Sequence, residues 1–382
     1  MLRNKDKGIT LIALVITIII LLILAGISIS ALTNQGLFKN AKAAQNATEK
    51  AEEEQGQRLN EYEDEINKYL NNANEDEKIG LITDNINKEL SKTDNTKLKD
   101  EKGNRIVVPA GFKIVNGATT VDKGIVIEDV TETATKGSQF VWIPVGTITK
   151  SDGTTATITL GRYDFDATTG KESAYSGTYV EEDSNDSSTL KKYGNTIAKN
   201  ITNFKNSVAT NGGYYIGRYE ARTATARSAK DNALTQITEK GTENVYNYVT
   251  QLQAAQLSQN MYTSNKFTSD LMNSYAWDTA TVFIQNCGTN AKYSRQNSLN
   301  TALLQTGTNS LTDTSKIDVQ CNIYDMASNI WEWTTETSND SSNPCVYRGG
   351  INNSLNHYTS YRYRYHTSLS HYKLGFRPLL YL

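Results

Sequence analysis

The side chains best suited to binding another molecule gather near the C-terminus, in residues 351–372, which we call the binding tract. From residue 352 it reads NNSLNHYTSYRYRYHTSLSHY, and it holds all three histidines of the chain and five tyrosines. Tyrosine offers a large amphipathic contact with few torsions to fix, and serine and asparagine offer adaptable hydrogen bonds. We therefore predict a ligand-binding surface formed by Asn352, Asn353, Asn356, His357, Tyr358, Ser360, Tyr361, Arg362, Tyr363, Tyr365, His366, Ser368, Ser370, His371 and Tyr372.

A second interpretation of the same tract stays open. Tyrosine and arginine alternate from 361 to 365, and a period of two is also typical of a half-buried strand. On that interpretation the tract is a polar strand and loop without a ligand. Glycine-containing segments at 348–350 and 375–378 bracket the tract, and we expect them to hold it rigidly.

Composition narrows the function classes. The formal net charge of -2 provides no basic field, so we expect no nucleic-acid partner. The three cysteines, Cys287, Cys321 and Cys345, form an odd set without metal-binding spacing. One disulfide bridge is the most that they allow, and a disulfide framework is excluded. A chain of 382 residues is long enough for one large domain or two smaller ones.

Residues 9–31 are apolar and uncharged, and the segment before them carries Arg3, Lys5 and Lys7. About 20 apolar residues cross the hydrocarbon core of a bilayer, and basic residues stay on the cytoplasmic side. The pattern therefore predicts a single-pass membrane protein with a cytoplasmic N-terminus and an extracellular C-terminal part. A buried helix of a soluble protein is the alternative.

The N-terminus also resembles that of type IV prepilins. A short basic leader, residues 1–8, ends at Gly8, and Ile9 begins the apolar run with Thr-Leu-Ile at 10–12. The resemblance implies cleavage between Gly8 and Ile9 by a prepilin peptidase, and other pilins as partners in a pilus. The chain has Ala13 where most pilins carry a glutamate. That carboxylate pairs with a neighbouring subunit's amine during assembly, so its absence argues against a filament.

The rest of the chain divides by pattern. Apolar residues at helical spacing from 37 to 70 extend the pilin-like helix over 9–72. Residues 73–104 are expected to form a short helix (79–90) and a polar linker (91–104). From 105 onward short strands dominate, at 106–109, 112–115, 124–128, 140–145, 157–165 and 214–221. The patterns further predict an elaborated loop region at 151–207, helices at 245–262 and 269–287, and β structure at 323–334.

Five motifs in this part occur in the order of one known family. They are FVWIPV at 140–145, YYIGRYE at 214–220, YDMASNIWEWT at 324–334, YRGG at 347–350 and GFRP at 375–378. Residues 105–382 thereby resemble the formylglycine-generating-enzyme-like, or sulfatase-modifying-factor, domain. The resemblance implies a variant C-type-lectin fold. The expected fold class is α+β, with a long N-terminal pilin-like transmembrane helix followed by this domain.

The oxidases of that family use two cysteines in a Cys-x-Arg-Tyr-Arg-Cys segment. Here Ser360 and Tyr365 stand at the cysteine positions. A thiolate is needed to hold copper(I) and to exchange with substrate, and neither a hydroxyl nor a phenol replaces it. The iron-dependent relatives need clustered histidines, and no histidine precedes His357. We therefore expect no enzymatic activity and no required cofactor; a secreted oxidase is the least favoured hypothesis.

The family also carries a calcium site at its Trp-Glu-Trp turn. Carried over by position, its ligands would be the side chains of Asp325 and Glu332 and the backbone carbonyls of Ser328 and Ile330. In the alternative, Asp325 caps a turn and Glu332 pairs with an arginine. Trp331 and Trp333 are expected in the core.

Non-enzymatic members of this fold serve as variable proteins of diversity-generating retroelements, where adenine-directed mutagenesis rewrites codons near the C-terminus. Every residue from Ile351 to Tyr372 belongs to the set that such mutagenesis favours. The resemblance implies a surface-displayed protein that binds an unknown protein or glycan through the tract. Arg362 and Arg364 also fit the family's Arg-Tyr-Arg framework element. A pilin subunit with a structural role in a filament is the second hypothesis.

Overall fold

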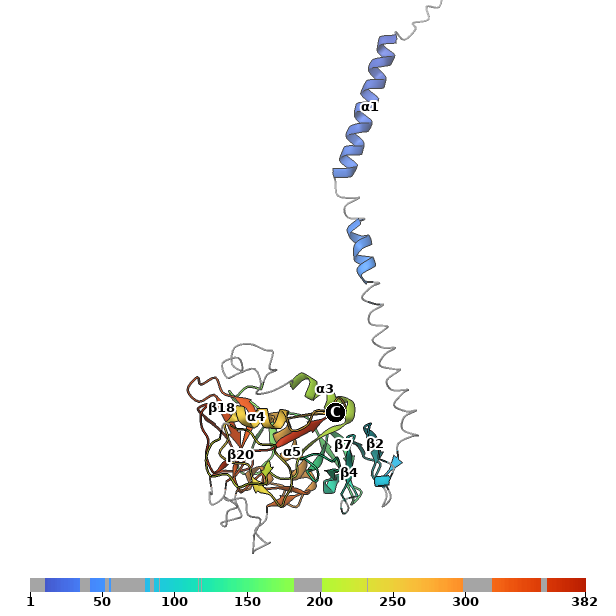
Figure 1. The fold of residues 1–382 in the computed structure, drawn as a ribbon. Helices are drawn as coiled ribbons and strands as arrows, with labels where there is room; N and C mark the ends of the chain where they lie inside the picture. Colours follow the sequence, from blue (N-terminus) through green and yellow to red (C-terminus); the bar gives the residue numbers. More distant parts are fainter. Residues whose placement is uncertain are drawn as a thin grey trace, which may run out of the picture. The chain divides into compact units, whose positions relative to one another are not determined.

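The chain divides into two compact units, Met1–Lys78 and Ile79–Leu382, which are drawn in the computed structural model of Figure 1. The structure describes residues 11–34, 42–51, 55, 80–82, 86–88, 90–115, 117, 119–181, 201–231, 233–297, 318–351 and 356–382. The two units are described separately.

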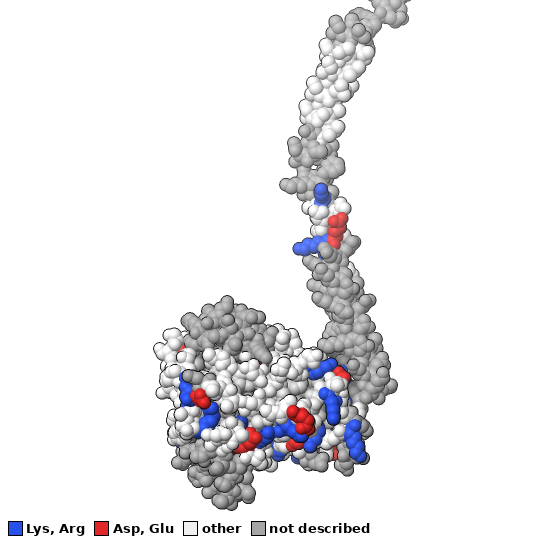
Figure 2. Space-filling model, in the orientation of Figure 1, with Lys and Arg blue, Asp and Glu red and all other residues white. Residues whose placement is uncertain are grey.

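The first unit contains helix α1, Leu11–Asn34, and a further helical stretch at 42–51. α1 carries no charged side chain, so its described side chains are all white in Figure 2. Large apolar side chains between 14 and 29 are exposed. Among the residues whose side chains are described, no helix is long and apolar enough to cross a membrane. The predicted leader, Gly8 and Ile9 lie outside the described residues.

A six-stranded antiparallel sheet forms the core of the second unit. Its strand order is β14-β21-β11-β6-β5-β4. The strands are β4 (Phe112–Ile114), β5 (Val126–Asp129), β6 (Gln139–Pro144), β11 (Gly213–Gly217), β14 (Thr268–Leu271) and β21 (Pro378–Tyr381). β6 and β11 are the FVWIPV and YYIGRYE motifs, and their large side chains, including Trp142 and Tyr215, are fully buried. The C-terminal strand β21 therefore lies inside the sheet, between β14 and β11.

Three helices accompany this sheet in the second unit. α3 (Ile201–Asn211) contacts β11 and β21, α4 (Gln251–Gln259) contacts β14, and α5 (Ser274–Cys287) contacts β6. Most of α5 is buried because its sequence is largely apolar or small, and its buried Asp278 is paired with arginines. It lies between the core sheet and the part of the unit that carries the binding tract, since it also contacts β17.

A second sheet carries the binding tract. Its order is β19-β18-β17-β20, with β19 as an edge strand. The strands are β17 (Trp331–Thr337), β18 (Cys345–Arg348), β19 (Arg362–Tyr365) and β20 (Leu374–Phe376). β17 pairs antiparallel with β18 and parallel with β20, and β18 pairs antiparallel with β19. The Trp-Glu-Trp motif, the Arg-Gly-Gly motif and the Gly-Phe-Arg motif thus meet in one sheet.

Smaller elements complete the second unit. A three-stranded sheet contains β1 (Gly80–Leu81), β2 (Thr96–Lys99) and β3 (Arg105–Val108). Four two-stranded pairs are β7 (Gly146–Thr149) with β8 (Thr155–Ile158), β9 (Tyr163–Phe165) with β10 (Glu172–Ala174), β12 (Arg222–Thr223) with β13 (Asn244–Val245), and β15 (Val319–Gln320) with β16 (Ile323–Tyr324). The short 3-10 helices are η1 (Ile86–Lys88), η2 (Val121–Lys123) and η4 (Tyr293–Arg295).

The predicted strands at 106–109, 112–115, 140–145 and 214–221 are confirmed by β3, β4, β6 and β11, and the strand at 124–128 begins two residues later as β5. Other expectations differ from the structure. The expected short helix at 79–90 contains β1 and η1, and the expected linker at 91–104 contains β2. The expected strand at 157–165 is two strands, β8 and β9.

Both predicted helices begin later than expected. The helix at 245–262 shortens to α4, because Thr250 and Gln253 form a capping box that starts it. The helix at 269–287 divides into β14 and α5, because 268–271 pair with β21 and the Asn273 side chain accepts a hydrogen bond from Ala276 N. An asparagine in this position begins a helix and ends the preceding strand.

Candidate ligand-binding site

The first half of the binding tract is attached to the η4 turn by its backbone. Thr359 N donates to the carbonyl of Gln296 (3.0 Å) and Ser360 N donates to that of Ser294 (3.1 Å). The buried indole of Trp277 donates to the carbonyl of Thr359 at 2.9 Å. These bonds use backbone groups of the tract, so they do not depend on which side chains the tract carries. Asn352 and Asn353 lie outside the described residues.

The middle and the second half are held in the same way. Arg348 Nε donates to the carbonyl of Tyr361 at 3.1 Å. Asn247 Nδ2 donates to the carbonyl of Tyr372 at 2.9 Å, and Tyr248 N donates to that of His371 at 3.2 Å. All three donors belong to the domain outside the tract. The surrounding framework therefore determines the path of the tract.

The side chains of the tract mostly reach the surface. The exposed fractions of Tyr363 and Tyr365 are 45% and 37%. Three further predicted binding residues are exposed, and the others whose side chains are described are half-buried. The exposed set is Asn356, Tyr363, Tyr365, His366 and Ser368; the half-buried set is His357, Tyr358, Ser360, Tyr361, Arg362, Ser370, His371 and Tyr372. Two other described residues of the tract, Ile351 and Thr359, are buried.

Aromatic rings form a continuous row on one face of the second sheet. We call the set Trp331, Tyr347, His357, Tyr361 and Tyr363 the aromatic row. Ring centroids are 5.0 Å apart for Trp331–Tyr347, 5.1 Å for Trp331–His357, 4.5 Å for His357–Tyr361 and 6.0 Å for Tyr361–Tyr363. Burial lowers the pKa of His357. This imidazole is therefore neutral at pH 7, and the row presents a broad uncharged surface.

Trp331 differs from the expectation that both tryptophans lie in the core. Trp333 is fully buried, and its indole donates to the carbonyl of Val249 at 2.8 Å. Trp331 is half-buried and contacts His357 of the tract. Trp331 and Trp333 are alternate residues on the same face of β17. They have different surroundings because β17 begins near the surface and continues into the core.

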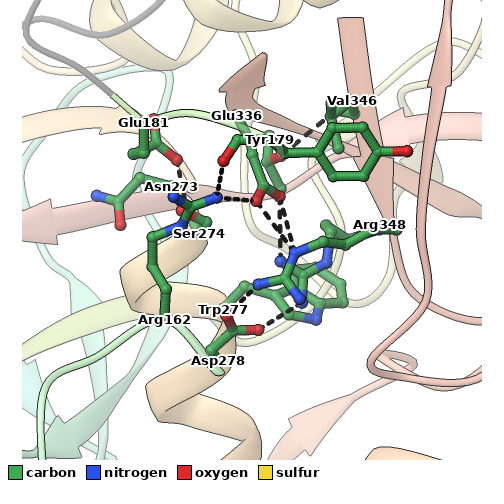
Figure 3. A network of polar contacts seen from close by, with 12 residues as sticks. Arg162, Tyr179, Glu181, Asn273, Ser274, Trp277, Asp278, Glu336, Val346 and Arg348 are labelled. Carbon is green, nitrogen blue, oxygen red and sulfur yellow. Dashed lines mark hydrogen bonds and ion pairs between the residues drawn. The ribbon is translucent and has the colours of Figure 1, made fainter. Parts of the chain in front are cut away.

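Arg362 also differs from its predicted role. Its side chain is only 9% exposed and forms ion pairs with Asp278 and Glu336. Arg348 pairs with the same two carboxylates, and Arg162 Nη2 lies 2.5 Å from Glu336 Oε1. Figure 3 shows this network around Glu336. Arg362 therefore fastens β19 to β17 and α5, as a framework residue would.

Electrostatics support the pairing in this network. Burial alone would raise the pKa of Glu336, but Arg362, Arg348 and Arg162 together hold it below its ordinary value. Burial raises the pKa of the neighbouring Glu181 to about 7, and the charge of Glu336 adds to that rise. Glu181 accepts hydrogen bonds from Thr335 Oγ1 at 2.5 Å and from Ser274 N at 2.8 Å.

A pocket of about 440 Å³ opens beside the first half of the tract. The tract contributes four lining residues, Tyr358, Ser360, Tyr361 and Arg362. The other walls come from segments that the sequence did not mark, namely residues 164–165, residues 175–179 and Arg295. The sequence pattern of these segments is ordinary and does not indicate a site. They lie beside the tract only in the folded chain.

The framework motifs on either side of the tract are tightly packed. A Cβ placed on Gly350 would lie 1.9 Å from the carbonyl oxygen of Ala327, so only glycine fits there. Arg377 forms a bidentate pair with Glu332 (2.7 and 3.1 Å) and donates to the carbonyls of Gly217 and Tyr324. The expected rigid framing of the tract is thus explained by one close backbone approach and one buried arginine.

The residues expected to bind calcium are engaged with protein groups. Arg377 occupies both oxygens of Glu332, and Asp325 Oδ1 accepts from Ser328 Oγ at 2.9 Å. This is the alternative arrangement of a turn and an arginine pair. Among the described residues, no group of three or more His, Cys, Asp and Glu side chains could hold a metal ion. The arrangement around Ile330 and these side chains does not fit the expected site, and calcium binding stays a prediction.

Burial disfavours the charged forms of the acids nearby. It raises the pKa of Asp318 to about 6 and raises that of Asp325 well above its ordinary value. Asp318 accepts from Tyr293 OH at 2.9 Å and from Ala327 N at 2.8 Å. The three cysteines are free, and Cys345 is buried.

No family model matches the chain, and no curated protein matches it. The structure is similar to that of Treponema denticola variable protein 1. The match covers 65% of this chain and 98% of that protein, with 12% sequence identity and a TM-score of 0.32. A second match, to CarF, covers 30% of this chain and 48% of that protein, with 17% identity and a TM-score of 0.22. Both TM-scores are below 0.5, so the function has to be argued from this chain's own residues.

Proposed function

We propose that this chain is a non-enzymatic, surface-displayed ligand-binding protein, and that it is the variable target protein of a diversity-generating retroelement. The observation that carries the proposal is that the backbone and the side chains of the binding tract have separate roles. Groups outside the tract hold its backbone, while Asn356, Tyr363, Tyr365, His366 and Ser368 have exposed side chains.

That separation of roles suits a surface whose side chains change. A hydrogen bond to a backbone carbonyl survives any substitution that leaves the backbone path intact. Exposed substitutions away from special features usually change stability by less than about 0.5 kcal/mol. Tyr363, Tyr365 and His366 are exposed positions of this kind. Thr359 and Arg362 are not, because one is buried and the other belongs to the ion-pair network.

The ligand is a protein or a glycan, bound without a required cofactor. The aromatic row offers flat, rigid contact area, and the turns at 356–360 and 366–372 offer hydroxyl, amide and imidazole groups. On the face drawn in Figure 2, basic and acidic side chains of the second unit are interspersed. Such a surface favours neither nucleic acid nor another strongly charged partner.

The proposal includes a membrane anchor at residues 9–31, cut between Gly8 and Ile9 by a prepilin peptidase, with other pilins as partners in the membrane or in a pilus. Its test is fractionation of cells that express the full chain. The full chain should appear in the membrane fraction with Ile9 as its first residue. Recovery in the soluble fraction, or an intact leader, contradicts the anchor but leaves the tract's binding role untouched.

The variable role is tested by sequencing the gene across a growing population and the DNA around it. Substitutions should concentrate at adenine-containing codons of 351–372 and spare those of 348–350 and 375–377. A near-identical template repeat and a reverse-transcriptase gene should lie close by. An invariant tract beside a variable remainder overturns the proposal.

A further inference from the structure

The pocket beside the tract has two walls. Tract residues form the tract wall, and residues outside the tract form what we call the constant wall. Tyr358, Ser360 and Tyr361 belong to the tract, whereas Asp164, Tyr175 and Arg295 do not. Its volume of about 440 Å³ lies in the range of small-molecule sites, about 300–1,000 Å³. The two walls come from segments far apart in the sequence, so the pocket exists only in the folded domain.

Arg295 provides a positive charge that forms no close ion pair with an acid of the described residues, although it helps to lower the pKa of Asp166. Its guanidinium carbon lies 4.0 Å from the centre of the Tyr358 ring, and its Nε is buried without a hydrogen-bond partner among the described residues. Arg362, the other lining arginine, is engaged by Asp278 and Glu336, which it shares with Arg348 and Arg162. Within the described part of the chain, Arg295 is therefore the lining cation with capacity for an anionic ligand group.

The constant wall also supplies a fixed ring and a hydrogen-bond acceptor. Tyr175 is held between Arg162 and Arg362, whose guanidinium carbons lie 4.4 and 4.3 Å from its ring centre. Asp164 Oδ2 accepts from Ser176 N and Ser176 Oγ, both at 2.8 Å. Both bonds use the same oxygen, so Oδ1 is left to accept from a ligand hydroxyl.

The tract wall is pre-formed. Tyr358 forms an isolated β-bridge with Asn297, and the next two tract residues bond to the η4 turn that contains Arg295. The Tyr361 ring is supported by His357 at 4.5 Å. A site whose groups are already ordered loses little conformational entropy when it binds.

We propose that this pocket binds an acidic sugar unit, a hexuronic acid or a similar carboxylated sugar at the end of a glycan. The carboxylate pairs with Arg295, the apolar face of the sugar ring lies against Tyr358 and Tyr361, and the hydroxyls bond to Asp164 and Ser360. A sugar fits better than an acidic peptide, because its several hydroxyl groups can donate to Asp164, whereas a glutamate side chain offers no hydroxyl group. The inference rests on the proposed function, since the tract forms one wall. Variation of the tract would then change the glycan preference while Arg295 keeps the carboxylate contact.

The test uses the full chain in detergent micelles and measures binding of glucuronate, glucose and an N-acetyl-glutamate amide by titration calorimetry or ligand-observed NMR. Glucuronate should bind at least about tenfold more tightly than glucose, because a hydrogen bond to a charged group contributes about 1.5–3 kcal/mol. Arg295→Gln should remove that preference. Arg295→Lys, which keeps the charge but not the planar fork, should keep part of it. Arg105→Gln, at an exposed arginine of β3 that does not line the pocket, is the matched control.

Equal affinity for glucuronate and glucose overturns the inference, and so does a preference for the glutamate amide over glucuronate, which would assign the pocket to an acidic peptide. An effect of Arg105→Gln equal to that of Arg295→Gln overturns it as well. Circular dichroism verifies that each variant is folded. A variable tract without glucuronate binding supports the proposed function and contradicts the sugar site. Glucuronate binding with an invariant tract supports the sugar site and contradicts the variable role.

Discussion

Arg362 and Arg364 lie on the same side of strand β19 and have opposite surroundings. Side chains two residues apart share one face of a strand. The Arg362 guanidinium is covered by Asp278, Glu336 and the ring of Tyr175. Arg364 is exposed, and among the described residues it pairs with Asp340 at 3.1 Å and hydrogen-bonds with Tyr179. One strand therefore contains both a structural arginine and a surface arginine.

We expect Arg362→Ala to lower the free energy of unfolding by about 1.5–3 kcal/mol, because it removes charge-assisted hydrogen bonds to two buried carboxylates, which keep Arg348 and Arg162 as partners. Arg364→Ala should change it by less than about 1 kcal/mol, since exposed ion pairs contribute little. Urea unfolding of the second unit, followed by tryptophan fluorescence, measures the free energy of unfolding of both variants. Equal losses for the two variants would show that Arg362 does not support the tract.

A second prediction concerns His357. Burial lowers its pKa below the ordinary value of 6.5, and its ring is packed against Trp331 and Tyr361. In an NMR titration His357 should therefore titrate below 6.5. Tyr361→Ala should move its pKa back toward 6.5 by exposing the ring. His371, whose pKa is lowered by burial and by Lys373, should not respond to that substitution and serves as the internal control.

At the residue scale the sequence predicted a set of tract side chains, of which Asn356, Tyr363, Tyr365, His366 and Ser368 are exposed, but not what surrounds them. Composition alone indicated Tyr363, Tyr365 and His366, because residue type and clustering are local properties. Arg295 and Tyr175 could not be found in the same way. They reach the tract through contacts that span more than 60 residues along the chain, and no local pattern encodes such contacts.

At the scale of elements, packing overrode local periodicity. The apolar spacing from 269 to 287 predicts one helix, yet 268–271 pair with β21 and the helix starts only after Asn273. Strand pairing with the C-terminal strand satisfies the backbone groups of 268–271 and also buries Leu271. The strands β6 and β11 were predictable because their apolar runs are short and lie inside the sheet, where both faces are buried.

The tract as an element depends on the close approach of its leading glycines to the chain at 326–327. We expect Gly350→Ala to lower the melting temperature strongly or to prevent folding, because the added Cβ would lie 1.9 Å from the Ala327 carbonyl oxygen. Gly103→Ala is the control. Gly103 has a φ of 83° and open space around its Cβ position, so it should cost only about 1–2 kcal/mol. Thermal unfolding by circular dichroism distinguishes the two, and equal losses would contradict the close packing.

For the second unit as a whole, buried acids set the response to pH. Burial raises the pKa of Glu181 to about 7 and that of Asp318 to about 6, and it raises the pKa of Glu239 and Asp325 well above ordinary values. Each of these acids holds its proton in the folded state at a pH where the unfolded chain has released it. Raising the pH through this range therefore favours unfolding.

Glu181 is one source of this effect, and a substitution at this position measures its share. Its contribution is fully present below its ordinary pKa of 4.5 and is lost as the pH rises to about 7. The free energy of unfolding should fall from pH 6 to pH 7.5, by at most about 1.4 kcal/mol per pH unit for this group. Glu181→Gln should flatten the profile, because glutamine does not titrate. The variant should still fold, since glutamine can accept from Ser274 N and donate to Thr335 Oγ1. Urea unfolding at pH 6, 7 and 8 measures both profiles. A wild-type chain that becomes more stable as the pH rises would mean that Glu181 ionises freely and that the network around Glu336 is more open to water than its geometry indicates.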